Sequence, residues 1–298
     1  MKKKTKAFLG KNPSGGEVLE QNTCPVCGSQ SVTLFKQVGE FIVLKCRSCR
    51  LIWVPNVTDA QLQSLYGSGY FKSQTGIGYE DYLADERHTR QDAEDILRQL
   101  PIKPDGARRL LDAGCAHGFL LDEARKQGWE TYGVDVNPEA HYHATKVLGL
   151  DVFCGSLEEA RFEDEYFDVV TVIGTIEHLR DPVSLIREAN RIMKKGGFLV
   201  ITTINTEQPV RLFRLIPPEH IFYFSASNLT RLLKSHGFET INGHRHGERF
   251  RIAYLISRFF RLVFSPSSRI DRYIKKLVFF RFSVKIPFNE MFILAQKI

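Results

Sequence analysis

The stretch LLDAGCAHGFLLDEARKQGWETYGVDV, residues 110–136, decides the fold that we expect of this 298-residue chain. Its first predicted strand ends beside Asp112, and its second, Thr131 to Val136, ends beside Asp135. Small residues at a strand-to-helix turn let backbone N–H groups approach a ligand, and an acid closing the next strand can bind ribose hydroxyls. We therefore expect a ligand that contains a nucleoside. The small residues of the turn are Gly114, Ala116 and Gly118.

From Arg108 onward, predicted strands alternate with predicted helices, which is typical of a parallel sheet covered on both faces. Prolines after capping residues begin two helices, at Pro138 and Pro182, and Gly196–Gly197 ends the helix expected over 183–195. Ser227 is the expected cap of a helix over 229–236. The fold class is thus α/β with seven strands, expected at Leu110–Ala113, Thr131–Val136, Asp151–Cys154, Phe167–Ile173, Phe198–Thr203, Phe238–Gly243 and Met291–Gln296.

Residues 23–58 contain two CxxC pairs, in CPVCGSQSVTLFKQVGEFIVLKCRSC. This spacing predicts a small N-terminal zinc ribbon, in which two knuckles aim their thiolates at one tetrahedral zinc ion. Because cysteine would fill every ligand position, the zinc is expected to be structural. Two disulfides and a nucleic-acid-binding ribbon are the alternatives; scarce basic residues disfavour the second. The predicted ligands are Cys24, Cys27, Cys46 and Cys49.

Two further regions flank the ribbon. Residues 1–22 carry Gly, Pro, Ser and Lys without periodicity, which predicts a flexible tail. Residues 59–107 are expected to hold a short helix at 59–66, a glycine-rich aromatic loop and a polar helix at 84–100. The loop could form a lid over a neighbouring site, or the region could be a passive linker. The sheet domain is expected over residues 108–298.

A dinucleotide-binding turn would have a third glycine where this chain has Phe119. The pattern DxGxxxG, followed by an acidic strand end, instead resembles class I S-adenosylmethionine-dependent methyltransferases, whose sheet is Rossmann-like and seven-stranded. The resemblance continues through FDVVTVIGTIEHLRDP and MKKGGFLVITT and covers about residues 108–240. The ribbon and the segment PPEHIFYFS are similar to a bacterial subgroup of these enzymes that is often linked to glycan or small-molecule pathways.

The resemblance implies where S-adenosylmethionine binds. Asp112 would orient the methionine ammonium, and Asp135 would accept from the ribose hydroxyls. Ala116 replaces the usual middle glycine of the turn, which tightens the approach of the backbone. Either Ser156 or Glu158 would accept from the adenine amine. The other implied cofactor-binding residues are Gly114, Cys115, Gly118, Val136, Leu157, Ile173 and Gly174.

The sulfonium already activates the methyl group, so the protein must position the acceptor and remove its proton. His178 is the candidate general base, with Glu177 orienting it, because imidazole titrates near neutral pH. Alternatively, both side chains only bind local backbone. His220 could contact the acceptor or be a packed loop histidine, and Tyr223 could stack on a ring.

Much of the net charge of +7 falls in an insert at about residues 244–287. Two basic amphipathic helices are expected there, over 251–264 and 269–280, and they could contact an anionic membrane. They could equally cover the sheet, close the acceptor site or form a dimer interface. Their large aliphatic faces disfavour nucleic acid. The sequence shows no signal peptide and no membrane-spanning segment, so we expect a cytoplasmic protein. The basic insert could associate this protein with a membrane surface.

Together these patterns predict methyl transfer to a hydroxyl group of a glycan, a lipid-linked sugar or another small molecule. Methylation of nitrogen, RNA or protein is an alternative. A different class of function is a non-catalytic interaction module that binds the cofactor without turnover. The sequence makes no prediction of the oligomeric state.

Overall fold

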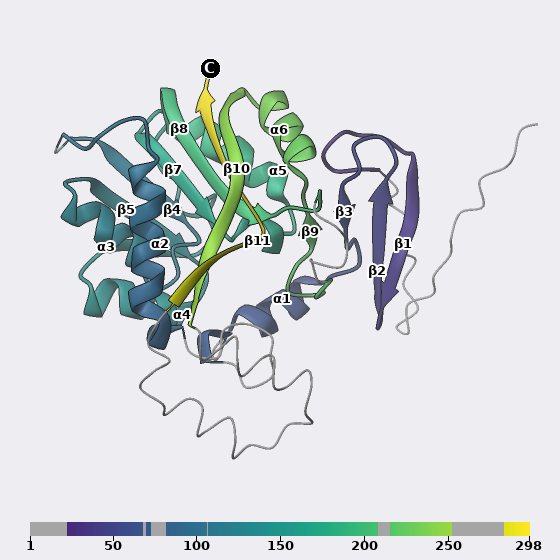
Figure 1. Ribbon diagram of the computed structural model, residues 1–298, viewed down its shortest axis with the longest axis horizontal. Coiled ribbons are helices and arrows are strands. Elements are labelled where there is room, and N and C mark those ends of the chain that lie inside the picture. Colours follow the sequence, from purple (N-terminus) through teal and green to yellow (C-terminus); the bar gives the residue numbers. More distant parts are fainter. Residues whose placement is uncertain (1–22, 68–69, 73–81, 106, 208–214, 252–282) are drawn as a thin grey trace, which may run out of the picture.

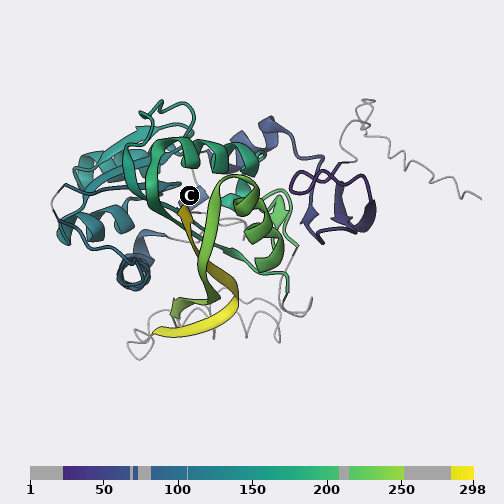
Figure 2. The same ribbon diagram turned by 90° about the horizontal axis from the view of Figure 1, so that it is seen from above.

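The computed structural model describes residues 23–67, 70–72, 82–105, 107–207, 215–251 and 283–298. In this part of the chain, a seven-stranded sheet carries helices on both faces, and a four-stranded sheet lies to one side of it (Figures 1 and 2). The predicted tail at 1–22 and most of the glycine-rich loop lie outside the described residues. None of the helices among the described residues is both long and apolar enough to cross a membrane.

The large sheet confirms the expected α/β class. Its strands β6, β5, β4, β7 and β8 run parallel, and β11 is antiparallel to both of its neighbours. Because the order of strands reverses between β4 and β7, a crevice is expected at the carboxyl ends of these two strands. In spatial order the strands are β10 (Phe238–Arg251), β11 (Ser283–Lys297), β8 (Met193–Ile204), β7 (Phe167–Ile173), β4 (Arg109–Ala113), β5 (Glu130–Asp135) and β6 (Asp151–Cys154).

Alternation along the strands divides the core between the two faces of the sheet. Leu110 packs with residues of α2 (Glu86–Arg98) and α3 (Phe119–Lys126), whereas Leu111 packs with residues of α5 and α6 on the other face. Both leucines are fully buried. Parallel strands covered on both faces are nearly continuous apolar runs, which is why this region is legible in the sequence. The two helices of the second face are α5 (Pro182–Ile192) and α6 (Ala226–Ser235).

The smaller sheet combines residues that are far apart in the chain. It contains β1 (Val32–Val38), β2 (Phe41–Cys46) and β3 (Ile52–Trp53), all within the four-cysteine segment. Its fourth strand, β9 (Phe222–Tyr223), comes from the PPEHIFYFS segment and pairs with β3. A single hydrophobic core runs from this sheet to the α5 and α6 face of the large one.

The short helix expected at 59–66 is found as α1 (Asp59–Tyr66), which begins at a capping box formed by Thr58 and Gln61. Other boundaries differ from expectation. Helix α5 ends at Ile192 because Met193 already pairs with Phe167 in the sheet. The cap of α6 is Ser225, not Ser227, because Asn228 completes a capping box with it.

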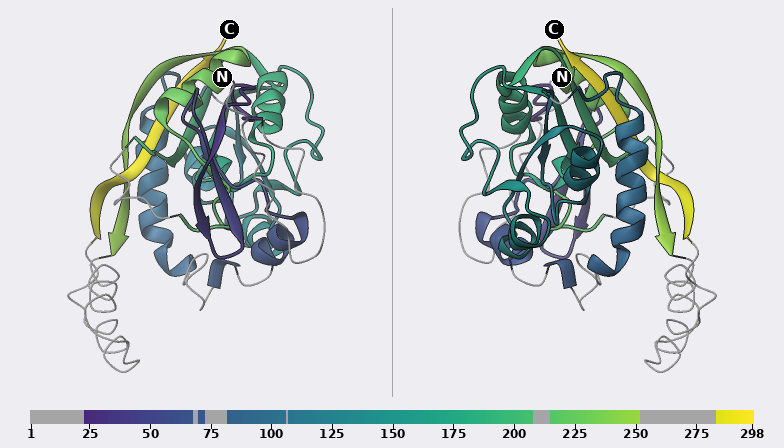
Figure 3. Two further views of the ribbon diagram at one scale, coloured as in Figure 1. Left: turned by 90° about the vertical axis from the view of Figure 1, so that its right-hand side faces the viewer. Right: turned by 90° about the vertical axis from the view of Figure 1, so that its left-hand side faces the viewer.

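The basic insert begins differently from the prediction. Its flanks continue β10 and β11 as a long hairpin that lies beside α2 (Figure 3). Arg251, the expected start of a helix, lies in β10 instead, because it pairs with Ser283. The rest of the two predicted amphipathic helices falls in residues 252–282, outside the described part.

Candidate functional site

A cavity of about 1730 Å³ lies at the carboxyl ends of the parallel strands, where the order of strands predicts a crevice. Helices α1 and α2 and the loop after β7 contribute to its wall. Gly118 does not line it: a side chain there would meet Leu150 and Ala144, so this glycine serves packing behind the turn. The predicted cofactor-binding residues that line the cavity are Asp112, Gly114, Cys115, Ala116, Asp135, Val136, Ser156, Leu157, Ile173 and Gly174.

The Asp135 carboxylate is held by two backbone N–H groups. Ala116 donates to Oδ2 at 2.7 Å, and Asn137 donates to Oδ1 at 2.8 Å. Burial raises the pKa of Asp135. Each carboxylate oxygen has a second lone pair, so this side chain can still accept hydrogen bonds from a ligand in the cavity.

Asp112 is almost fully buried, and its Oδ1 accepts a hydrogen bond of 2.7 Å from the Thr171 hydroxyl. Burial raises the pKa of Asp112 to about 7, and the nearby Asp135 contributes to the increase. A cation placed beside these two acids would favour the ionised form of Asp112. The wall of the cavity is therefore suited to a positively charged ligand.

The turn between β4 and α3 uses unusual backbone conformations. Gly114 has a φ of 82°, and a Cβ there would lie 2.3 Å from Thr175 Oγ1. Ala116 has a φ of 46°, a left-handed conformation that costs a residue with a side chain roughly 1–2 kcal/mol. Burial raises the pKa of the Cys115 thiol, so this residue is a small packing group rather than a nucleophile.

Two predicted contacts at the far end of the cofactor site are already engaged with protein groups. Ser156 Oγ accepts from the Glu159 backbone at 3.2 Å, and Ser156 and Glu158 both line the cavity. The Gly174 N–H donates to the Thr202 backbone oxygen at 3.0 Å. A hydroxyl oxygen has a second lone pair, so both predicted adenine acceptors, Ser156 and Glu158, remain able to accept from a ligand.

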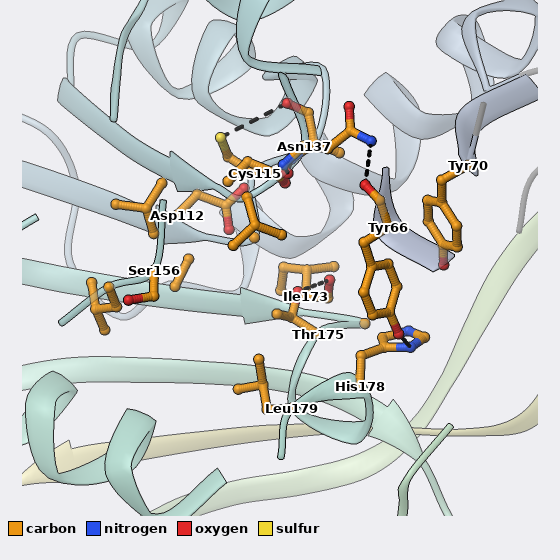
Figure 4. Close-up of a pocket in the computed structure, with 18 of the residues that line it drawn as sticks. Tyr66, Tyr70, Asp112, Cys115, Asn137, Ser156, Ile173, Thr175, His178 and Leu179 are labelled. Atoms are coloured by element: carbon orange, nitrogen blue, oxygen red, sulfur yellow. Dashed lines mark hydrogen bonds between the residues drawn. The ribbon is translucent and has the colours of Figure 1, made fainter. Parts of the chain in front are cut away.

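His178 lies on the opposite wall, in the loop after β7. Its Nδ1 is 2.8 Å from the Tyr66 hydroxyl (Figure 4). The Glu219 backbone oxygen is 2.7 Å from the same Nδ1 and also accepts from the Tyr66 hydroxyl. A carbonyl oxygen can only accept, so the 2.7 Å contact requires a proton on Nδ1. In the neutral ring this leaves Nε2 with a free lone pair, the form that a general base needs.

Glu177 and His220 lie next to His178 but do not line the cavity. Glu177 accepts a hydrogen bond of 2.8 Å from the Thr203 hydroxyl, and burial raises its pKa. The groups that orient His178 are therefore Tyr66 and Glu219, in place of Glu177. The His220 ring packs edge-on against His178, with centroids 4.7 Å apart, and burial holds its pKa well below the usual value.

Tyr223 cannot stack on a ligand as predicted, because it is fully buried in β9 and its hydroxyl accepts from the Ile216 N–H at 2.9 Å. The aromatic wall of the cavity comes from the end of α1 and from described residues of the glycine-rich aromatic loop that the sequence predicted to lie near a site. These are Tyr66, Tyr70, Phe71 and Tyr82, from α1 and the segment that follows it.

A second arm of the cavity reaches between α2 and the β10–β11 hairpin. His88 and His246 line this arm, and both are at least nine-tenths buried. Burial lowers the pKa of His246 to about 4, so it is neutral at pH 7. Arg249 joins the two elements by pairing with Asp92 at 2.5 Å and with Asp95 at 2.6 Å.

The four cysteines form a compact group of their own. Their Sγ atoms all lie within 4.8 Å of one another, with Cys24 and Cys49 3.4 Å apart and Cys27 and Cys46 3.6 Å apart. Disulfide sulfurs would be about 2.05 Å apart, whereas thiolates on a tetrahedral zinc with 2.3 Å bonds would be about 3.8 Å apart. The separations fit a shared metal ion better than two disulfides.

Comparison with known proteins gives one family. A family model described as a methyltransferase domain matches residues 85–242. Ubiquinone biosynthesis O-methyltransferase from Aliivibrio fischeri is 32% identical over 120 residues, which cover 38% of this chain and 51% of that protein. The protein of the same name from Hahella chejuensis is 34% identical over 121 residues, with 38% and 50% covered. This chain spans about half the length of the curated relatives that it matches.

Solved structures show the same fold. The YcgJ protein from Bacillus subtilis aligns with a TM-score of 0.51 at 19% sequence identity, covering 70% of this chain and 98% of its own. At this identity the likeness concerns the fold alone. The family match covers the parallel strands β4 to β8, whose carboxyl ends border the cavity.

Proposed function

The chain belongs to the methyltransferase domain family, and from this premise we propose that it moves a methyl group from S-adenosylmethionine to a hydroxyl oxygen of a small molecule. That it is an S-adenosylmethionine-dependent methyltransferase follows from the family. The observation that carries the choice of chemistry is that one cavity holds the acids Asp112 and Asp135 on one wall and His178 on the other.

The residues present fit the cofactor. S-adenosylmethionine supplies a methyl group that its sulfonium has already activated. Asp112, buried and with a pKa raised to about 7, is placed to bind a cationic ammonium group. Ala116 and Asn137 fix the Asp135 carboxylate, which would accept hydrogen bonds from the ribose hydroxyls.

His178 performs the proton transfer. Its Nδ1–H is held by the Glu219 carbonyl and the Tyr66 hydroxyl, so Nε2 accepts the proton of the acceptor hydroxyl. The buried neighbour His220 is kept neutral and supports the ring by packing.

The acceptor is assigned to a ring-bearing hydroxyl compound. The names of the relatives specify O-methylation, and the tyrosines of the wall give flat surfaces for a phenolic ring or a sugar. The part of the acceptor remote from the reacting oxygen would enter the arm between α2 and the hairpin, where His88 and His246 can hydrogen-bond to it.

We assign a structural zinc ion to the four cysteines, as a zinc ribbon. The separations of their sulfur atoms support this assignment. All four ligands are thiolates, so no coordination position is left for an acceptor or water. Metal analysis of the purified protein should find one zinc per chain, and a metal-free protein of unchanged stability would contradict the assignment.

Two measurements test the proposed reaction. Calorimetry with S-adenosylhomocysteine should detect stoichiometric binding to the purified protein. Mass spectrometry should then find a metabolite heavier by about 14 Da in cells that express the protein, because replacing hydrogen by methyl adds one CH₂ unit. The amount of product should fall by at least roughly 100-fold with His178→Asn. Cofactor binding without any methylated product would favour the non-catalytic interaction module.

A further inference from the structure

The smaller sheet, β1–β2–β3–β9, is called the four-cysteine sheet because β1 to β3 lie in the segment that carries the four cysteines. Strand β9 joins this sheet to the loop that carries His178. Ile52 pairs with Tyr223 and Trp53 pairs with Phe222, so the last strand of this sheet lies two residues after His220. Next to this pair, the Val54 N–H donates to the Ile221 carbonyl at 2.9 Å. The backbone of β9 is therefore fixed by the segment that carries the cysteines.

The connection continues from β9 to the candidate base. The Ile221 N–H donates to the Glu177 carbonyl at 2.8 Å, directly before His178 in the chain. The Glu219 carbonyl, two residues earlier, accepts from the His178 ring. Residues 219–221 thus bond on one side to the four-cysteine sheet and on the other to the His178 loop.

A second connection runs along the chain. After β3, the chain continues into α1, whose last residue, Tyr66, reaches His178 with its hydroxyl. The Asn228 side chain in α6 donates to the Cys49 carbonyl at 3.5 Å, which ties the second knuckle to the same face. The two groups that contact the His178 imidazole, the Tyr66 hydroxyl and the Glu219 carbonyl, are therefore each connected to the four-cysteine sheet, through α1 and through β9.

The donor side is held mainly by hydrogen bonds among its own strands and turns, and among the described residues its hydrogen bonds to α1 and the adjacent Gly67 come from the Asn137 side chain. Asp112 bonds to Thr171 in the neighbouring strand, and both oxygens of Asp135 bond to backbone close to its own strand. Its contact with α1 runs through the Asn137 side chain, which donates to the Tyr66 carbonyl at 2.8 Å.

We infer that the four-cysteine sheet is a positioning element for the acceptor side of the site: β9 and α1 fix the position of the His178 imidazole, while the cofactor side is held mainly by hydrogen bonds among its own strands and turns. The inference rests on the zinc assigned under the proposed function, because metal binding is what orders a segment of this kind. The metal would then not only stabilise its own segment but also fix the position of the His178 ring.

The test compares three variants of the whole 298-residue chain. Cys27→Ser removes one ligand, Cys27→His restores a Cys₃His set that also binds zinc, and Cys154→Ser is a control at an exposed cysteine outside the group. Hydrogen exchange is followed at the amides of residues 219–224 and, for comparison, 110–118. The ¹⁵N shifts of His178 report its tautomer, and calorimetry with S-adenosylhomocysteine reports the donor side.

With Cys27→Ser we expect exchange at 219–224 to rise at least roughly tenfold while exchange at 110–118 stays within about twofold, because local openings are independent of the rest of the fold. The His178 tautomer should become mixed, and cofactor affinity should change less than about threefold. Cys27→His and Cys154→Ser should both behave like the wild type.

Two results would overturn the inference: unchanged exchange and tautomer at the acceptor side, or equal loss of protection in both segments, which would make the sheet a general stabiliser. These readings require no turnover. A wild-type protein that fails to bind S-adenosylhomocysteine would contradict the proposed reaction and leave the exchange comparison intact. A wild-type protein without zinc would contradict the metal and this inference together.

Discussion

The donor and acceptor sides of the cavity are built in opposite ways. The donor side is formed mainly by residues 112–118 and 133–137, whose hydrogen bonds join neighbouring strands and turns. The acceptor side brings together Tyr66, His178 and Glu219, from three separate parts of the chain. A local site survives changes elsewhere in the fold, whereas an assembled site depends on every segment that contributes to it.

Replacing the candidate base should separate the two sides most clearly. In His178→Asn, the amide nitrogen can keep the contact with the Glu219 carbonyl, but no group remains to accept a proton. Methylation of the acceptor should fall by roughly 10²–10⁴-fold, the usual contribution of a general base. Affinity for S-adenosylhomocysteine, measured by calorimetry, should remain unchanged. Wild-type turnover in this variant would eliminate His178 as the base.

The reverse separation is expected from Asp135→Asn. The new amide group cannot accept from both Ala116 and Asn137, so the turn loses one hydrogen bond as well as the charge. Affinity for S-adenosylhomocysteine should weaken by about 1–3 kcal/mol, roughly 5- to 150-fold. The ¹⁵N shifts of His178 should not move. Asp151→Asn, at the exposed start of β6, is the matched control and should bind normally.

The pH dependence of stability gives a third test. Because the folded pKa of Asp112 is raised to about 7, its carboxyl group contributes stability below the unfolded pKa, and this contribution is lost as the pH rises towards 7. Asp112→Asn should therefore stabilise the cofactor-free protein more at pH 8 than at pH 4. The difference should be roughly 1–4 kcal/mol, because a tenfold change in an acid dissociation constant corresponds to about 1.4 kcal/mol. Urea unfolding at both pH values measures it, and an equal effect of the substitution at both would contradict the assigned burial of the charge.

The smallest effect concerns the backbone of the turn. Ala116→Gly relieves a left-handed residue, at a gain of about 1–2 kcal/mol offset by roughly 0.5–1 kcal/mol of added chain entropy. The net gain in unfolding free energy should lie between about 0 and 1.5 kcal/mol, with a slight gain in cofactor affinity. Ala140→Gly, in the ordinary helix α4 (Pro138–Tyr142), should instead destabilise the protein. Destabilisation by both glycines in chemical unfolding would show that the turn is not strained.

The sequence predicted the donor side well because its signals are local. Once the strands are recognised in the sequence, the positions of the acids at their ends and of the small residues at the turn follow directly. All of these predicted residues except Gly118 line the cavity. Gly118 was misassigned because small residues at such a turn also serve close helix packing, here against Leu150.

The residues of the acceptor side could be predicted only in part from the sequence. His178 stood out by its residue type, but its partner Tyr66 is 112 residues away in the chain. The sequence did not predict that Phe222 and Tyr223 form a strand of the four-cysteine sheet. Two residues are too few to show the alternation of apolar and polar residues that marks a strand. The helix before β8 was predicted too long because pairing of Met193 with Phe167 outweighed local helix propensity.

Strand β9 belongs to the four-cysteine sheet but comes from the segment that bonds to the His178 loop, and this limits where the protein can be truncated. A shortened chain that began at Asp59 would leave Phe222 and Tyr223 without the strand that pairs with them, and would uncover apolar groups that Trp53 and Leu51 now bury. An unpaired apolar edge invites association with other copies of the chain. We therefore expect the shortened protein to aggregate, even though the family match begins only at residue 85.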